Sequence, residues 1–170
     1  LIKTVQQNLE FATYIDIMDR LDKDSYYVTD IHWKQEKITD VADYILKVMG
    51  VYSDKELKEM YRDEAFHGVY YGQMAIPVHA DTLVCLTWNG MDDCSVYDYE
   101  TSSYIDIYKK KYLDSNDPYS VYLSGSKSLL ELTNPDADSD KELIIFRDSF
   151  GSSIAPLLLR SYSKITLVDT

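Results

Sequence analysis

The spacing of apolar residues predicts two helices in the first part of the chain. Residues 34–49 bring apolar side chains to one face at intervals of three and four, and Gly50 is a typical helix stop; these side chains are Ile38, Val41, Ala42, Ile45 and Met49. Residues 53–60 predict a second, charged helix, because a serine stands at its start and a glutamate follows three residues later. Before these helices, Phe11, Thr13, Ile15 and Ile17 occupy every second position of residues 11–17. This period of two predicts a strand.

The pattern over residues 68–100 predicts several short strands. Apolar runs at residues 69–71, 74–78 and 82–88 are separated by small or polar residues. The last run ends at Asn89-Gly90, a dipeptide favoured in two-residue hairpin turns. We therefore expect a β-rich insertion in this part of the chain.

The end of the chain has the pattern of a β-α-β unit. Residues 142–146 and 164–168 are largely apolar runs, as in strands that are buried on both faces. Residues 154–162 between them predict a helix, with Pro156 near its first turns, where proline is best tolerated. Two strands joined through a helix run parallel with a right-handed crossover. The pattern predicts an α/β fold with a mainly parallel sheet.

Composition narrows the classes of partner. The 170 residues fit one domain, and the net charge of −12 gives no basic surface to neutralise nucleic-acid phosphates. The one basic run, residues 109–111, is soon followed by acidic residues and predicts a solvated face. No run of apolar residues is long enough to span a membrane. The sequence starts without Met, and we expect it to be a segment of a longer protein.

Two residue types leave alternatives open. The sixteen tyrosines are suited to half-exposed strand packing or to stacking on sugar rings. Cys85 and Cys94 could form a disulfide or remain two thiols, and no Cys/His spacing resembles a zinc site.

A serine turn near the end of the chain is the first candidate for chemistry. Ser149 follows the predicted strand 142–146 and precedes the predicted helix, at the strand edge where open α/β sheets bind ligands. A helix N-terminus supplies free N–H groups and a positive field, which favour an alkoxide and an oxyanion. The alternative is that Ser149, Ser152 or Ser153 simply caps the helix.

An acid and a histidine near the start of the chain could serve such a serine. Asp30 and His32 are two residues apart, so in an extended segment they point to the same side. Asp30 could orient His32, which would then act as the general base. The alternatives are a surface or capping histidine, and a metal site shared with His67, His79 or Asp81.

Three blocks of sequence resemble the bacterial DHHW family. Residues 26–33, Tyr-Tyr-Val-Thr-Asp-Ile-His-Trp, are similar to the motif Tyr-Tyr-x-Thr-Asp-His-His-Trp that names the family. Residues 117–125 and 144–153 resemble its Asp-Pro-Tyr and Asp-Ser blocks, in the family order. Ile31 stands where the family has its first His, and Ser126 where it tends to have Asn after Gly125.

The resemblance implies a fold and a set of roles. DHHW proteins resemble the alginate O-acetyltransferases, whose domains are SGNH-hydrolase-like. Residues 1–170 would then form a single three-layer SGNH-like domain with a mainly parallel sheet and the β-rich insertion. Ser149 would be the nucleophile, His32 the base and Asp30 its orienting acid, with Gly125, Ser126 and the backbone N–H of Ser149 as candidates for the oxyanion hole.

The same resemblance implies a setting and partners. We expect a cell-envelope or extracellular carbohydrate O-acetyltransferase or acetylesterase that needs no cofactor and no metal. Its partners would be a polysaccharide or other sugar acceptor, an acyl donor and an envelope acyl-transport protein. The competing hypothesis is a non-catalytic envelope protein that binds polysaccharide through its tyrosines.

Overall fold

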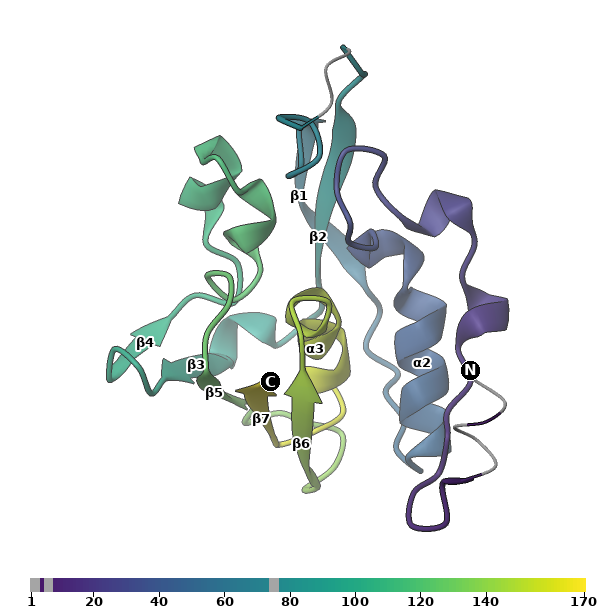
Figure 1. Ribbon diagram of the computed structural model, residues 1–170. Coiled ribbons are helices and arrows are strands. Elements are labelled where there is room, and N and C mark those ends of the chain that lie inside the picture. Colours follow the sequence, from purple (N-terminus) through teal and green to yellow (C-terminus); the bar gives the residue numbers. More distant parts are fainter. Residues whose placement is uncertain (1–3, 5–7, 74–76) are drawn as a thin grey trace.

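The chain folds into a mixed α/β structure with two sheets and few helices (Figure 1). The computed structural model describes residue 4, residues 8–73 and residues 77–170. The helices are α2 (Thr39–Val48) and α3 (Gly151–Leu159). Short 3-10 turns connect other segments, namely η1 (Met18–Arg20), η2 (Lys23–Ser25), η3 (Gln35–Lys37), η4 (Met91–Asp93), η5 (Lys110–Asp114) and η6 (Pro118–Val121).

The larger sheet has five strands in the order β4-β3-β5-β7-β6. These strands are β3 (Ser95–Asp98), β4 (Ser103–Ile105), β5 (Leu129–Thr133), β6 (Glu142–Arg147) and β7 (Lys164–Asp169). Only β6 and β7 pair in parallel, while the other three pairs are antiparallel. A parallel pair needs a crossover connection, and α3 between β6 and β7 provides the one in this sheet. The expected mainly parallel sheet is therefore wrong, and the sheet is mixed.

The second sheet is a separate antiparallel ribbon of β1 (Lys58–Phe66) and β2 (Asp81–Thr87). Its first strand overlaps the helix expected over residues 53–60. Instead of capping a helix, the Ser53 hydroxyl accepts a hydrogen bond from the Lys55 N–H at 3.2 Å, a tight local turn. Pairing with β2 then draws the following residues into a strand, so long-range pairing overrides the local capping signal.

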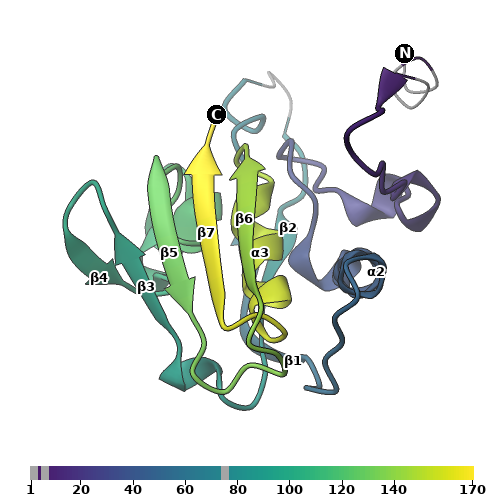
Figure 2. The same cartoon turned by 90° about the horizontal axis from the view of Figure 1, so that it is seen from below.

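The expected three-layer arrangement is also not what the described residues form. The helix α3 packs on one face of the larger sheet, and Figure 2 shows the strands in front of it. On the opposite face, the β6 side chains Ile144 and Phe146 are 64% and 72% exposed. The apolar run of β6 is therefore covered on one face only.

The β-α-β unit itself confirms the sequence pattern, with one shift. The helix α3 begins at Gly151, three residues before the predicted start, so Pro156 lies inside it. All nine residues of α3 are buried, and none of them carries a charge. Pro156 removes one backbone donor from the helix, and burial of the whole helix offsets that cost.

Other predictions had mixed outcomes. The helix over residues 34–49 is confirmed as η3 followed by α2, with Ile38, Val41 and Ala42 buried. Residues 11–17 form no strand, because no neighbouring strand pairs with them in the described structure.

The β-rich middle is confirmed only in part. The run 82–88 falls in β2 except for Trp88, but the run 69–71 forms a turn, and the run 74–78 lies largely outside the described residues. Gly90 adopts a φ of +100° in a turn, as its sequence suggests. The turn does not close a hairpin, since β2 pairs with β1 and β3 pairs with β4 and β5.

Two further features concern the cysteines and membrane spans. Cys85 and Cys94 are free thiols, and burial raises their pKa values to about 12 and about 11. Within the described ranges, no helix has the length and apolar character needed to cross a membrane.

Candidate active site

The structure brings together three side chains that are far apart in sequence. Ser149 Oγ lies 2.7 Å from His32 Nε2, although 117 positions separate the two residues. The other ring nitrogen, His32 Nδ1, hydrogen-bonds to Asp30 Oδ1. His32 and Asp30 are buried, whereas Ser149 is partly exposed. The arrangement has the connectivity of a nucleophile, a base and an orienting acid.

Asp30 is held on both carboxylate oxygens. Its Oδ1 also accepts the backbone N–H of His32 at 3.0 Å, and its Oδ2 accepts the N–H of Val69 at 3.0 Å. Burial by itself would raise the pKa of Asp30, but the hydrogen bonds from His32 and Val69 outweigh it and hold that pKa below 3.8. Asp30 is therefore ionised at neutral pH and favours the His32 tautomer that carries its proton on Nδ1.

The segment that carries Asp30 and His32 is a closed loop. An antiparallel bridge joins Tyr26 to Trp33, and the Tyr27 N–H donates to the His32 carbonyl at 3.1 Å. These contacts close the base of the loop, and Asp30 lies near its tip. The loop contains no helix or strand of its own, so its shape depends on contacts from elsewhere.

A second carboxylate, Asp81 at the start of β2, supplies the first of those contacts. Asp81 Oδ2 accepts hydrogen bonds from the Thr29 N–H at 2.7 Å, the Thr29 hydroxyl at 2.8 Å and the Val28 N–H at 2.9 Å. Thr29 Oγ1 in turn accepts the Gly68 N–H at 3.0 Å. Asp81, considered above as a metal ligand, instead anchors the loop that presents Asp30.

Gly68 supplies the second contact through its lack of a side chain. A Cβ added at Gly68 would lie 2.2 Å from the Asp30 Cβ and 2.6 Å from the Thr29 carbonyl oxygen. Those separations are far below van der Waals contact, so only glycine lets the two backbones approach this closely. The segment around Gly68 thus packs directly on the acid of the site.

The turn that carries Ser149 has a different construction. It joins the end of β6 to the start of α3, and the Phe150 N–H donates to Asp148 Oδ1 at 3.0 Å within it. The buried Arg147 side chain braces the turn, because it donates to Ser152 Oγ at 3.2 Å and to the Lys127 carbonyl at 3.1 Å. The nucleophile candidate is therefore fixed mainly by its own neighbours in sequence.

The helix-capping alternative for the three serines does not fit this geometry. No side chain caps the N-terminus of α3. Ser149 Oγ faces His32, Ser152 Oγ accepts from Arg147, and Ser153 Oγ accepts from Trp33 and Tyr119. Each hydroxyl has a partner outside the helix end.

Two of the oxyanion candidates, Gly125 and Ser126, lie in a turn with unusual backbone angles. Gly125 has a φ of +83° and its N–H already donates to the Tyr122 carbonyl at 3.1 Å, while Ser126 is exposed. The Ser149 N–H, by contrast, donates to no acceptor within the described parts of the chain. That free N–H sits at the start of α3, where the helix field favours negative charge.

Neither of the other two histidines has a hydrogen bond to this cluster in the described structure, and the His67 ring bonds to the Ala65 carbonyl. His67 packs against Tyr71 with ring centroids 4.0 Å apart, and His79 is exposed. Across residues 8–73 and 77–170, no three His, Cys, Asp or Glu side chains gather closely enough to hold a metal ion.

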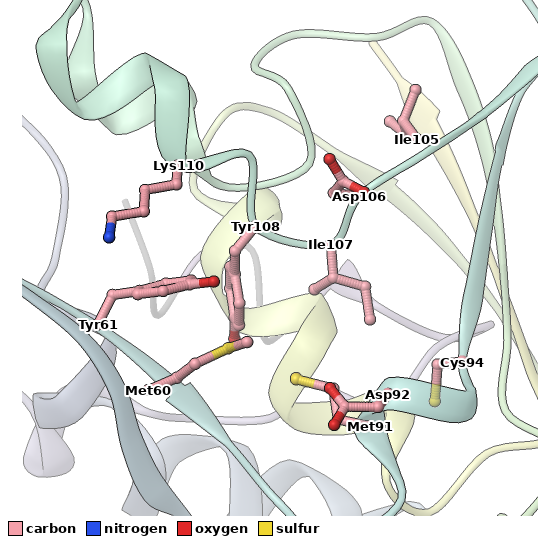
Figure 3. A pocket seen from close by; sticks show the side chains of 10 residues that line it. All are labelled: Met60, Tyr61, Met91, Asp92, Cys94, Ile105, Asp106, Ile107, Tyr108 and Lys110. Carbon is pink, nitrogen blue, oxygen red and sulfur yellow. The ribbon is translucent and has the colours of Figure 1, made fainter.

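A surface cavity of about 450 Å³ lies between β1 and the segment that follows β4 (Figure 3). Tyr61 from β1 and Tyr108 line it, and Lys110 Nζ lies 5.3 Å from the Tyr61 ring centre. None of its ten lining residues belongs to the Asp30, His32 and Ser149 cluster. The cavity is therefore a separate feature of the surface.

Sequence reasoning missed several residues that support the cluster. Tyr119 stacks on His32, Ser153 bonds to Tyr119 and Trp33, and Arg147 braces the serine turn. Tyr119 and Trp33 lie in the blocks that resemble the DHHW family, and this was the one available signal. Their contacts join segments far apart in sequence, so no local pattern could reveal them.

The chain resembles several solved structures. It matches a DHHW family protein from Eubacterium siraeum with a TM-score of 0.67 and 18% identity, over 86% of this chain and 51% of that one. It matches PatB1 from Bacillus cereus carrying a sulfonyl adduct with a TM-score of 0.60 and 17% identity, over 86% and 52%. A second PatB1 structure gives 0.59 and 18%, over 86% and 54%.

The comparisons show which property this chain shares with the solved structures. No protein-family model and no curated protein matches the sequence. At 17–18% identity the likeness extends to the fold, and the chain spans about half the length of the matched structures. The residues described above thus sit on a fold shared with a DHHW family protein and with PatB1.

Proposed function

We propose that this domain transfers acyl groups through Ser149, as a cell-envelope carbohydrate O-acetyltransferase or acetylesterase of DHHW and SGNH-like type. The observation that carries the proposal is the 2.7 Å contact between Ser149 Oγ and His32 Nε2, with Asp30 on the other ring nitrogen. A base must lie within hydrogen-bond reach of the proton that it takes, and His32 does.

The proposed reaction has two halves. Ser149 Oγ attacks the acyl carbonyl carbon while its proton moves to His32 Nε2, and the ionised Asp30 stabilises the resulting imidazolium. The carbonyl electron pair moves to oxygen, near the free N–H of Ser149. When the tetrahedral intermediate collapses, His32 gives its proton to the leaving group and the acyl group stays on Ser149.

The second half restores the enzyme. A sugar hydroxyl or a water molecule attacks the acyl-serine carbonyl, and His32 removes its proton. Collapse of the second intermediate returns that proton to Ser149 and releases the acylated sugar or the free acid. Transferase and esterase differ only in this acceptor, so the same three residues serve both.

The solved structures support the proposal in two ways. PatB1 carries a sulfonyl adduct in one structure, and sulfonyl groups attach to activated nucleophiles. The DHHW family protein shares the fold, and residues 26–33 of this chain carry a close version of the motif in that name. We propose the envelope setting, the sugar acceptor and the acyl donor on the basis of the family resemblance.

The competing hypothesis is polysaccharide binding without catalysis. Tyr52 and Tyr104 are 76% and 72% exposed, so aromatic surface is available for sugar rings. Binding alone, however, gives no reason for a buried Asp30–His32 pair aimed at a serine hydroxyl.

Hydrolysis of p-nitrophenyl acetate separates the two functions. We expect Ser149-dependent turnover that falls by at least about 100-fold in Ser149→Ala, because removal of a nucleophile leaves only residual catalysis. Ser103→Ala is the matched control, since that serine is exposed and lies in β4, at the opposite edge of the larger sheet from β6. Equal turnover by wild type and Ser149→Ala would contradict the proposal.

A further inference from the structure

We propose that Tyr119, anchored by Ser153, is a positioning residue that sets the plane of the His32 imidazole. The inference rests on the proposed function and deepens it, because it identifies how the base is aimed at Ser149.

The first observation is a flat aromatic contact. The Tyr119 and His32 rings are stacked with centroids 3.7 Å apart and planes within 6° of parallel. Tyr119 belongs to η6, a different segment from those that carry the base and the nucleophile. It is 4% exposed, so water does not reach this face of the imidazole.

The stack supplies a restraint that the two hydrogen bonds of the imidazole lack. Asp30 holds Nδ1 and Ser149 holds Nε2, so the two hydrogen bonds fix the ring at two points. Such a pair leaves the ring free to tip about the line joining its partners. A parallel ring at 3.7 Å blocks that tipping.

Ser153 fixes Tyr119 in turn. Its buried hydroxyl accepts the Tyr119 O–H at 2.8 Å and the Trp33 Nε1–H at 2.9 Å. The same hydroxyl lies 3.4 Å from the Phe150 carbonyl oxygen, to which it donates. One side chain of α3 therefore joins the segment of the base, the segment of Tyr119 and the turn of Ser149.

Tyr119 remains a neutral donor throughout. Burial raises the pKa of Tyr119 well above 10, with Asp30 and Asp148 adding to the rise. The groups that face His32 are Asp30 from its own loop, Tyr119 from η6, and Ser149 and Phe150 from the serine turn. Of these groups, Asp30 alone is charged. The neutral Tyr119 ring therefore restrains the His32 imidazole by stacking on its face and not through a charge.

The chain offers variants that separate ring from hydroxyl. Tyr119→Phe keeps the stacked ring and removes the bond to Ser153, while Tyr119→Leu removes the ring. Ser153→Ala keeps the ring and removes its anchor. Tyr122→Phe is the matched control, since Tyr122 is equally buried but its hydroxyl bonds to the Val84 carbonyl and not to this network.

Two measurements test the assignment. The first is the rate constant for sulfonylation by phenylmethanesulfonyl fluoride, followed by intact mass, together with kcat and KM for p-nitrophenyl acetate. We expect Tyr119→Leu to lower the rate constant and kcat by about 30-fold with KM unchanged, because a misplacement of about 1 Å costs about 100-fold and a tipped ring shifts its nitrogens by less. Tyr119→Phe should stay within about 5-fold of wild type, and Ser153→Ala should fall between them.

The second measurement is the proton NMR shift of the His32 ring, which needs no activity. The stacked Tyr119 ring shields those protons, so Tyr119→Leu should move them downfield, whereas Tyr122→Phe should not. A Tyr119→Leu variant with wild-type rate or wild-type shift would overturn the proposal. If that variant does not fold, unchanged sulfonylation in Ser153→Ala would overturn it. Absence of Ser149-dependent reaction in wild type would instead overturn the proposed function, while the NMR shift would still decide whether the rings stack.

Discussion

The two halves of the candidate triad are built in opposite ways. Ser149 sits in a short turn between β6 and α3, so local backbone geometry places it. Asp30 and His32 sit in a loop with no regular structure, and contacts from distant residues place them. The serine half is thus determined locally, and the acid–base half by long-range contacts.

This difference in construction predicts which half of the triad is more sensitive to substitutions far from the reacting atoms. In the serine half, Arg147 and Ser152 brace the turn from within five residues. In the acid–base half, Asp81 and Gly68 hold the loop from about 40 to 50 residues away. A change far from the reacting atoms should therefore disturb Asp30 and His32 more readily than Ser149.

The largest effect is expected at Gly68. In Gly68→Ala the new Cβ would lie 2.2 Å from the Asp30 Cβ, so one of the two backbones must move. We expect the unfolding free energy to fall by about 2 kcal/mol and kcat/KM to fall by about 100-fold. Urea unfolding and p-nitrophenyl acetate turnover measure the two effects.

The neighbouring Gly72 is the matched control for that change. A Cβ at Gly72 would meet nothing within 4 Å, so Gly72→Ala should leave stability and turnover near wild type. Equal behaviour of the two variants would show that close packing on Asp30 is unimportant.

A smaller effect is expected from the same change in the serine half. In Gly151→Ala the new Cβ would lie 2.6 Å from the Arg147 Cβ, and this side chain must shift. Alanine in a helix regains about 0.5–1 kcal/mol over glycine, which offsets part of the strain. We expect a net change within about 1 kcal/mol and a loss of turnover below about 10-fold. A loss as large as that of Gly68→Ala would contradict the contrast between the two halves.

The smallest effect is a dependence of stability on pH. The pKa of Asp30 is held below 3.8 in the folded chain, so its ionised form stabilises the fold above that pH. The contribution should be complete at neutral pH and disappear as the pH falls through the lowered pKa. Urea unfolding of wild type and Asp30→Asn should therefore differ most at neutral pH and converge as the pH falls below the lowered pKa of Asp30. A constant difference across that range would contradict the lowered pKa.

The same contrast explains how far the sequence could predict the structure. The β-α-β unit was predictable, because the apolar runs of β6 and β7 flank a small-residue turn and a buried helix. Asp30 and His32 were singled out by their two-residue spacing and their motif. Their contact with Ser149 spans 117 positions, and no periodicity reports on such a separation.

The failures have the same physical origin. A helix was predicted over residues 53–60 from a local capping signal, but pairing between β1 and β2 decides that region. The strand β6 was expected to be covered on both faces, yet Ile144 and Phe146 are exposed because α3 packs on the other face of the sheet. Which face of a sheet is covered is set by the tertiary arrangement, which a local apolar run does not encode.

The most direct test of the central claim is covalent labelling of the serine. Intact protein is treated with phenylmethanesulfonyl fluoride, and the modified peptide is located by mass spectrometry in wild type and in His32→Ala. The account predicts a single adduct on Ser149 in wild type, formed at least about 100-fold more slowly in His32→Ala, since the base activates the hydroxyl. Adducts spread over other serines, or an equal rate in both proteins, would contradict it.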